Sequence, residues 1–328
     1  MKFEKVRWGI IGCGDVTEVK SGPAFQKVKN SELVAVMRRT GELAKDYAER
    51  HHVPKWYDNA DSLINDPDVD AVYIATPPGS HKEYTLKAAQ AGKPVYVEKP
   101  MALNFAECQE MIAACKAAGV PLFVAYYRRE MPRFLKIKAL LEKNAIGDVR
   151  FVSTTQYQKA SDDVKDPEKL SWRVQPEISG GGLYYDLASH TLDLLDFLLG
   201  PIKNVNGFAS NQAGYYRAED IVTGTYMFES GIHGTGTWCF SAFENVDVNE
   251  IIGSKGKITF STFGSEPIVL TTAEGAEQWS FEPLQHVHQP LVETIVEELT
   301  GDGGKCPSTG DSGARTNWVM GEMTKTML

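Results

Sequence analysis

Val6-Arg7-Trp8-Gly9-Ile10-Ile11-Gly12-Cys13-Gly14-Asp15-Val16-Thr17 is the stretch of sequence that decides the fold. Its first six residues form a short apolar run, which predicts a strand buried on both faces of a sheet. Similar runs cover residues 33–37, 71–75, 94–98 and 121–125, and helical patterns cover residues 41–51, 81–91 and 104–118. Alternation of buried strands with helices predicts a doubly wound parallel sheet, an α/β domain over residues 1–126.

The pattern changes after Tyr126, where longer strands alternate apolar and polar residues. We expect strands over residues 149–158, 204–212, 220–229, 232–241, 257–261 and 267–272, and helices over residues 132–144 and 182–199. Such alternation is typical of antiparallel sheets. Residues 127–328 are therefore expected to form an α+β C-terminal domain with a large, mainly antiparallel sheet. The Gly- and Ser-rich segment 301–313 is expected to be a loop.

The composition excludes several classes of function. A net charge of −9 over 328 residues argues against a broad nucleic-acid-binding surface. The N-terminus has no apolar signal region and the chain has no long apolar run, so we expect a cytoplasmic protein without a membrane partner. The five cysteines contain no C-x-x-C pair. His286 and His288 form a His-Val-His pair with no third ligand nearby, and no metal site is expected.

The loop after the first strand has the pattern G-x-G-x-x-G with Thr17 in place of the third glycine. Gly12 would make the tight turn, and Gly14 would allow the backbone to approach a pyrophosphate. Asp15 and Val16 would begin a helix whose exposed N–H groups and dipole favour a phosphate. A glycine-rich loop without a ligand is the alternative interpretation.

The second strand ends in Met37-Arg38-Arg39-Thr40, without the carboxylate that would bind a ribose 2′-hydroxyl of NAD. Two guanidinium groups are suited to the 2′-phosphate of NADP, because they make charge-assisted and often bidentate hydrogen bonds. We therefore expect NADP as the preferred cofactor, with NAD possible. An exposed basic turn is the alternative.

Glu98-Lys99-Pro100 falls at the carboxyl end of a predicted strand, where open α/β sheets bind ligands. Thr76-Pro77-Pro78 follows another strand and is expected at the same edge, with His81 opening the next helix. A lysine at this position can direct its ammonium group toward a substrate oxygen. The predicted cofactor-binding residues are Gly12, Gly14, Asp15, Val16, Arg38, Arg39, Thr76, Pro77, Pro78, His81, Glu98 and Lys99.

A second motif runs from Gly180-Gly181-Gly182 to Asp193 and places Asp186 and His190 four residues apart, on one face of a helix. A carboxylate one turn from an imidazole can orient it and raise its proton affinity. Redox chemistry at a hydroxyl carbon needs a group that takes or gives the hydroxyl proton. A surface Asp–His pair without catalytic function is the alternative.

Together, the glycine loop, Glu98-Lys99-Pro100 and the Asp186–His190 helix resemble the Gfo/Idh/MocA oxidoreductases over essentially the whole chain. The resemblance implies a Rossmann domain, a nicotinamide cofactor and a homodimer or homotetramer assembled through the second domain's sheet. It also implies Lys99, Asp186 and His190 as the catalytic set. We assign His190 as the general acid/base, Asp186 as its orienting partner, and Lys99 as the electrostatic stabiliser and an alternative proton donor. These residues are expected to meet in the cleft between the domains.

The predicted activity is hydride transfer between nicotinamide and a hydroxyl or carbonyl carbon of a sugar, cyclitol or small polyol. Arginine and aromatic side chains suit hydroxyl-rich ligands. The predicted substrate-binding residues are Lys99, Arg128, Tyr157, Trp172, Arg173, Asp186 and His190, with Tyr157 also an alternative proton carrier. Two other functions stay open: an NAD-retaining glycosidase of this family and a non-catalytic nucleotide-binding regulator.

Overall fold

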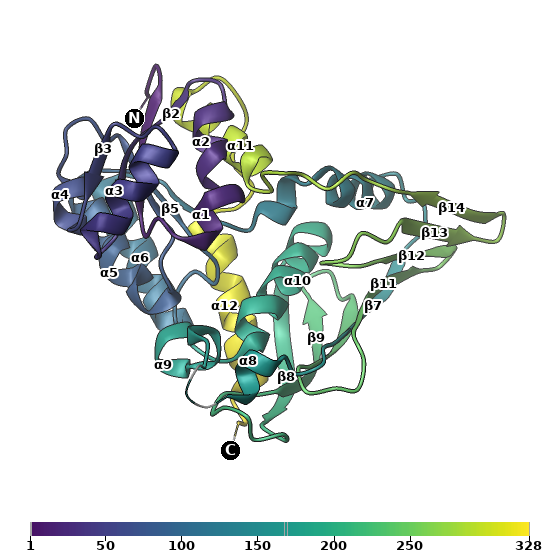
Figure 1. Ribbon diagram of the computed structural model, residues 1–328. Helices are drawn as coiled ribbons and strands as arrows, with labels where there is room; N and C mark the ends of the chain where they lie inside the picture. Colours follow the sequence, from purple (N-terminus) through teal and green to yellow (C-terminus); the bar gives the residue numbers. More distant parts are fainter. Residues whose placement is uncertain (1, 167, 169, 328) are drawn as a thin grey trace. The chain divides into compact units, whose positions relative to one another are not determined.

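The computed structural model describes residues 2–166, 168 and 170–327, which form two compact units (Figure 1). Unit 1 runs to Glu130 and also contains Leu284–Ala314. Unit 2 contains Met131–Pro283 and the chain from Arg315 onward. This division differs from the two continuous domains, 1–126 and 127–328, that the sequence predicts, because a segment near the C-terminus packs into the first unit.

Unit 1 is built on a six-stranded parallel sheet with the order β3-β2-β1-β4-β5-β6, which confirms the predicted Rossmann architecture. Its strands are β1 (Val6–Ile11), β2 (Ser31–Met37), β3 (Lys55–Tyr57), β4 (Ala71–Ile74), β5 (Val95–Val97) and β6 (Leu122–Val124). The sequence pattern does not predict β3. This edge strand has only three residues, and Trp56 at its centre is exposed, so no apolar run marks it.

The helices of unit 1 are α1 (Asp15–Val19), α2 (Gly22–Lys27), α3 (Gly41–Arg50), α4 (Ala60–Ile64), α5 (His81–Gln90), α6 (Phe105–Ala118) and α11 (Gln289–Thr300), with single 3-10 turns η1 (Pro78–Ser80) and η2 (Tyr127–Glu130). Helix α6 shows why the local signals worked. Asn104 accepts a hydrogen bond from the Glu107 N–H at its start, and Gly119 ends it in the left-handed conformation.

Helix α11 joins unit 1 through its apolar face. Leu291, Val292 and Ile295 are fully buried in one hydrophobic cluster with Trp8 and Tyr96. Periodicity predicts that a helix buries one face, but it does not identify the sheet that covers that face. The assignment of the C-terminal segment to the first unit therefore depends on contacts that are distant in sequence.

The predicted loop 301–313 is wrong at its end, because α12 (Gly310–Thr324) begins at Gly310. Positions 310 and 313 of this helix are glycines because a larger side chain would not fit there. A Cβ atom would lie 2.9 Å from Leu122 Cδ2 at Gly310, and 2.7 Å from Val124 Cγ2 at Gly313. Close packing against β6 therefore explains two glycines that composition alone places in a loop.

Unit 2 contains an eight-stranded sheet with the order β14-β13-β12-β11-β7-β10-β9-β8. Only the β7–β10 pair is parallel, so the expected mainly antiparallel sheet is confirmed. The strands are β7 (Val149–Tyr157), β8 (Ile202–Ser210), β9 (Ile221–Phe228), β10 (His233–Cys239), β11 (Val246–Gly253), β12 (Gly256–Phe260), β13 (Ile268–Thr272) and β14 (Gly275–Trp279). The helices are α7 (Pro132–Glu142), α8 (Asp162–Lys165), α9 (Pro176–Ser179), α10 (Leu183–Leu199) and the later part of α12, with a 3-10 turn η3 (Trp172–Val174).

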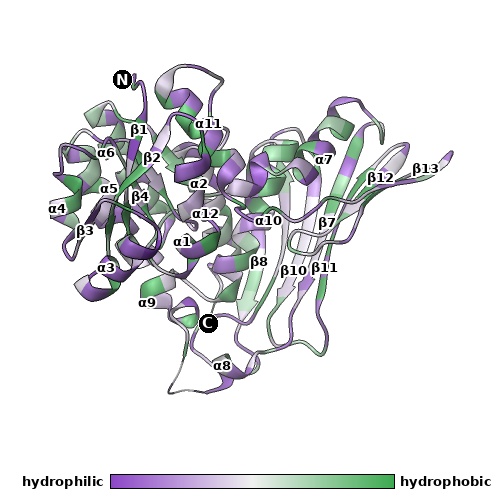
Figure 2. Cartoon of the chain, turned by 45° about the horizontal axis from the view of Figure 1, so that its top comes forward, coloured by the Kyte–Doolittle hydropathy of each residue, from purple (hydrophilic) through white to green (hydrophobic). Residues whose placement is uncertain are grey.

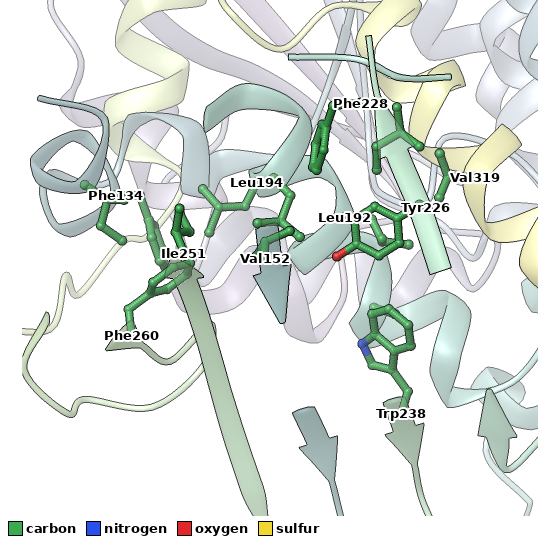
Figure 3. Close-up of a cluster of buried hydrophobic side chains, with 14 of the residues drawn as sticks. Phe134, Val152, Leu192, Leu194, Tyr226, Phe228, Trp238, Ile251, Phe260 and Val319 are labelled. Carbon is green, nitrogen blue, oxygen red and sulfur yellow. The ribbon is translucent and has the colours of Figure 1, made fainter. Parts of the chain in front are cut away.

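The two faces of this sheet differ, and its strands alternate between hydrophobic and hydrophilic residues (Figure 2). On the inner face, Tyr226 of β9 and Trp238 of β10 pack with Leu192 and Leu194 of α10 (Figure 3). The outer face carries the alternate residues of each strand, where Phe151, Phe208 and Val248 are exposed. The buried helix-covered face explains the alternation seen in the sequence.

Across the described residues, none of the helices combines the length and the apolar character that crossing a bilayer requires.

The stability of the protein should depend on His288, which lies fully buried at the start of α11. Burial lowers its pKa to about 3. An unfolded chain would protonate this histidine near pH 6.5. As the pH falls from about 6.5 toward 3, the unfolded state holds one more proton than the folded state. The free energy of unfolding should then fall by up to about 1.4 kcal/mol per pH unit.

We expect the His288→Gln variant to show a shallower decrease of unfolding free energy below pH 6.5 than the wild-type protein. Urea denaturation at a series of pH values measures this slope. His52→Asn, at an exposed position after α3, controls for the loss of a histidine. Identical slopes for the wild-type and His288→Gln proteins would contradict the prediction.

Candidate cofactor and active site

The predicted cofactor residues of unit 1 follow the carboxyl ends of its parallel strands. The glycine loop follows β1, Arg38 follows β2, Thr76 follows β4 and Glu98 follows β5. Parallel strands direct these ends toward one edge of the sheet, which is the usual ligand-binding edge of an open α/β sheet. The structure therefore brings these segments to one edge.

The two glycines of the loop have different roles. At Gly12, with φ of +90°, a Cβ atom would lie 2.7 Å from Thr76 Cγ2, so the protein's own packing requires glycine there. At Gly14, by contrast, the nearest heavy atom to a Cβ atom would be Gly12 O at 3.9 Å. The fold does not need a glycine at this position, but a pyrophosphate that contacts the backbone would. Asp15 and Val16 then open α1, so the loop fits a dinucleotide.

Thr17 occupies the third glycine position without disturbing the loop. It is fully buried, and its hydroxyl donates a 2.7 Å hydrogen bond to the Gly14 carbonyl. The hydroxyl of Tyr47 in α3 donates to the Thr17 carbonyl over 2.8 Å. Thr17 therefore holds the loop against α3.

Arg38 and Arg39 are exposed at the end of β2. Arg38 Nη1 lies 3.5 Å from the Cys13 carbonyl, so its guanidinium group reaches back to the glycine loop. The exposed position of both arginines leaves guanidinium N–H groups accessible to an anionic ligand beside that loop.

His81 connects two loops of the same edge from a fully buried position. Its Nε2 lies 2.7 Å from the Thr76 carbonyl, and its Nδ1 lies 3.1 Å from the Pro100 carbonyl. Burial lowers the pKa of His81. The ring therefore links the loops after β4 and β5. Thr76 and Pro77 are partly exposed and Pro78 is buried.

Glu98 and Lys99 follow β5 and differ in exposure. Glu98 is buried, and its Oε1 accepts a 2.6 Å hydrogen bond from the Tyr73 hydroxyl. Its Oε2 accepts from the Lys99 backbone N–H over 3.1 Å. Lys99 itself is partly exposed, and its peptide bond to Pro100 is cis. The buried carboxylate thus holds the backbone from which the lysine side chain extends.

Arg128 lies in η2, shortly after β6, and is buried. Its Nη1 donates to the Tyr127 hydroxyl over 2.9 Å, and its guanidinium group lies 5.0 Å from the centre of the Tyr127 ring. The predicted substrate-binding arginine therefore has a defined orientation set by its neighbour.

In unit 2, the glycine run before α10 permits close packing at the start of the helix. A Cβ atom at Gly182 would lie 2.7 Å from the Glu219 carbonyl oxygen. The Gly182 N–H donates to Glu219 Oε1 over 2.7 Å. Burial raises the pKa of Glu219 to about 7. Glu219 thus anchors the first turn of α10. No motif in the sequence marks Glu219 for this role.

Helix α10 brings several predicted site residues together. Arg173 Nε donates to Asp186 Oδ2 over 3.2 Å, and the same guanidinium group lies 4.5 Å from the centre of the Trp172 ring. His190, one turn beyond Asp186, is 4% exposed, and its ring meets Phe263 edge-on at 5.7 Å. A carboxylate and an imidazole on neighbouring turns of α10, with an arginine of η3 bound to the carboxylate, can bind a hydroxyl group and exchange its proton.

Tyr157 is placed apart from this group. It ends β7, where Val152, Thr154 and Gln156 are buried on the inner face and Tyr157 belongs to the alternating outer set. The alternation of strand side chains therefore directs Tyr157 to the face opposite α10.

The two histidines of His-Val-His have unrelated environments. His286 Nε2 lies 2.6 Å from Lys27 Nζ, whereas His288 is fully buried and its Nδ1 lies 2.9 Å from the Tyr96 hydroxyl. No group of three His, Cys, Asp or Glu side chains suited to a metal ion occurs among the residues that the structure describes.

Comparison with known proteins agrees with this geometry. Residues 6–126 match the oxidoreductase family with an NAD-binding Rossmann fold, and residues 134–259 match the GFO/IDH/MocA C-terminal domain. Oxidoreductase P35 of Formosa agariphila is 43% identical over 89% of this chain and 90% of its own length. The 1,5-anhydro-D-fructose reductase of Ensifer adhaerens is 28% identical over 94% of this chain and 92% of its own.

A solved structure of levoglucosan dehydrogenase, in complex with NADH and levoglucosan, is 25% identical to this chain. It aligns with a TM-score of 0.85 over 98% of this chain and 97% of the other. Both matched domains, the NAD(P)-binding fold and the 43% identical relative lead to one conclusion. The chain belongs to the Gfo/Idh/MocA family of NAD(P)-dependent oxidoreductases.

Proposed function

We propose that this protein transfers a hydride between NADP and a hydroxyl or carbonyl carbon of a sugar, cyclitol or related small polyol. The observation that carries the proposal is the arrangement at α10, where Asp186 and His190 lie on neighbouring turns and Arg173 of η3 donates to Asp186. Lys99, at the ligand-binding edge of the Rossmann sheet, completes the set. The names of two relatives, a 1,5-anhydro-D-fructose reductase and a levoglucosan dehydrogenase, support a sugar-like substrate.

Each protein residue has a separate task in this proposal. The nicotinamide accepts or supplies the hydride, while His190 takes or gives the proton of the substrate hydroxyl. Asp186 orients the His190 ring from one turn away, and Arg173 holds the Asp186 carboxylate through the 3.2 Å hydrogen bond. The Lys99 ammonium group stabilises negative charge on the substrate oxygen.

The cofactor preference rests on Arg38 and Arg39. Both are exposed at the end of β2, and Arg38 reaches the glycine loop through the Cys13 carbonyl. A guanidinium group gains more from a 2′-phosphate than from a 2′-hydroxyl, because the phosphate is charged. NAD remains usable because the glycine loop contacts the part that both cofactors share.

The assay that tests the activity follows NADPH oxidation with a panel of keto-sugars and aldehydes. We expect turnover with at least one of these compounds. Cleavage of a glycoside without net change in NADPH would instead identify the redox-neutral glycosidase. Tight cofactor binding without any reaction would identify a nucleotide-binding regulator.

Changing both Arg38 and Arg39 to Ala should weaken NADPH binding by about 10- to 100-fold, since each charged hydrogen bond contributes about 1.5–3 kcal/mol and the exposed site is partly screened. NADH binding should change little. Fluorescence titration measures both dissociation constants, and Lys45→Ala on the exposed face of α3 controls for the loss of positive charge. Equal losses for both cofactors would refute the preference.

His190→Ala should leave cofactor binding intact and lower kcat by about 10²- to 10⁴-fold, the usual contribution of a positioned acid or base. Asp186→Asn should cost less, because the proton carrier remains, and Lys99→Met should also reduce turnover. The double change at Lys99 and His190 should cost less than the product of the single losses if both act in one step. Steady-state kinetics at saturating NADPH measure these effects, and near-wild-type turnover of His190→Ala would remove it from the acid/base role.

The exposed outer face of the unit 2 sheet is proposed to pair with a second copy of the chain. Phe151 and Val248 are 44% and 39% exposed on adjacent strands, and Phe208 is 76% exposed on β8. Light scattering at micromolar concentration should give a dimer or tetramer, and Phe151→Lys with Val248→Lys should shift the mass toward the monomer. Leu43→Lys, at an exposed position on α3, should leave the mass unchanged. A monomeric wild-type protein would end this proposal.

A further inference from the structure

Four buried side chains of unit 1 form a cluster beside the Lys99 backbone, which we call the Glu98 cluster. It consists of Tyr73 in β4, Tyr96 in β5, Glu98 and His288. Both tyrosines and His288 are 0% exposed, and Glu98 is 7% exposed. The Tyr73 and Tyr96 rings stack at 4.8 Å. No step assigned above uses His288, although a fully buried imidazole beside a buried carboxylate needs a physical reason.

The polar groups of the cluster contact one another in series, from Tyr96 through His288 and Glu98 to the Lys99 backbone. The Tyr96 hydroxyl lies 2.9 Å from His288 Nδ1. On the other side of the ring, His288 Nε2 lies 3.6 Å from Glu98 Oε1, which also accepts the Tyr73 hydroxyl over 2.6 Å. Glu98 Oε2 accepts the Lys99 backbone N–H over 3.1 Å. A chain of polar groups therefore leads from α11 to the residue that carries the proposed catalytic ammonium group.

The chemistry of these groups selects one tautomer of His288. Burial lowers its pKa to about 3, so the ring is neutral and carries a single N–H group. If the Tyr96 hydroxyl donates to Nδ1, the ring proton sits on Nε2 and faces the Glu98 carboxylate. The other tautomer would place the Nε2 lone pair against that carboxylate, which is unfavourable in a buried site.

The surroundings of His288 agree with a neutral ring. The titratable and charged groups that face it from the packed elements are Glu98, Tyr73, Tyr96, Tyr127, Lys20, Lys99 and Arg128. The three cations disfavour a positive charge on the imidazole. The Tyr127 ring lies 4.6 Å from the His288 ring, and the His288 backbone N–H donates to the Lys20 carbonyl. These contacts hold the ring in its orientation toward Glu98.

We propose that His288 is a positioning residue for Lys99: its Nε2–H steadies the Glu98 carboxylate, which in turn holds the Lys99 backbone. The kinetic consequence rests on the proposed function, because it assumes that Lys99 acts on the substrate. The tautomer of His288 does not depend on that function. At 3.6 Å, His288 Nε2 lies beyond hydrogen-bond distance of Glu98 Oε1, so the Nε2–H acts on the carboxylate through electrostatic attraction.

The first experiment examines the cofactor-free protein by nitrogen–hydrogen correlation NMR of its histidine rings. The His288 signal is assigned as the one that disappears in His288→Gln. We expect the Nε2–H tautomer, unchanged from about pH 5 to about pH 8, a range above the pKa of about 3. A ring protonated at Nδ1, or a ring that titrates in this range, would overturn the proposal.

The second experiment compares two substitutions that differ in which side of the imidazole they reproduce. Gln places its amide where Nε2 was and keeps a donor for Glu98, whereas Asn reproduces the Tyr96 side and loses that donor. We expect His288→Asn to lower kcat about 10-fold with little change in cofactor affinity, because a misplaced catalytic group costs rate. His288→Gln should retain most of the turnover. If both variants lose kcat equally, and the loss follows the decrease in their thermal unfolding midpoints, His288 has only a structural role and the proposal is overturned.

A third comparison separates the two proposals from each other. In a Lys99→Met background, His288→Asn should cause no further loss of residual turnover, because its effect passes through Lys99. A full additional 10-fold loss there would show that His288 acts by another route and overturn the inference. If Lys99→Met alone leaves turnover unchanged, the proposed role of Lys99 fails, and the tautomer measurement still decides whether His288 faces Glu98.

Discussion

The parallel direction of six neighbouring strands is the constraint on which the rest of unit 1 depends. Because all six strands run in the same direction, their carboxyl ends all lie at one edge of the sheet. The glycine loop, Arg38, Thr76 and Lys99 are far apart in sequence, yet each directly follows one of these strands. The parallel strand direction therefore brings the predicted cofactor residues to one edge, and side-chain hydrogen bonds then set their orientation.

Buried polar groups set the orientation of these loops through hydrogen bonds within the protein. Thr17 closes the glycine loop on itself, His81 ties the loops after β4 and β5 together, and Glu98 holds the Lys99 backbone. In unit 2, Glu219 has the same task at the start of α10. A buried polar group without a partner is costly, so these hydrogen bonds favour one loop conformation over its alternatives.

Local sequence patterns predict most helices and strands, but they do not predict which elements pack against each other. Periodicity identified α10 and most strands of both sheets, and the end signals at Asn104 and Gly119 bounded α6 correctly. The same reasoning missed β3, which has no apolar run, and placed Gly310 and Gly313 in a loop although they face β6 in a helix. The site residues on strand ends and on α10 could be chosen from motifs. His288 could not, because its partner Tyr96 is 192 positions away in sequence.

The return of α11 to the first unit has a consequence for biosynthesis. While the ribosome has translated only as far as Glu130, the nascent Rossmann sheet lacks Leu291, Val292 and Ile295, which belong to its core. That apolar surface stays open until Gln289–Thr300 have emerged, so chaperones have a binding surface throughout that interval. A truncation at the end of β6, or a chimera that exchanges only the N-terminal segment, would inherit the same exposed surface. A chimera that keeps the core of unit 1 intact must therefore take both of its segments, Met1–Glu130 and Leu284–Ala314, from the same parent protein.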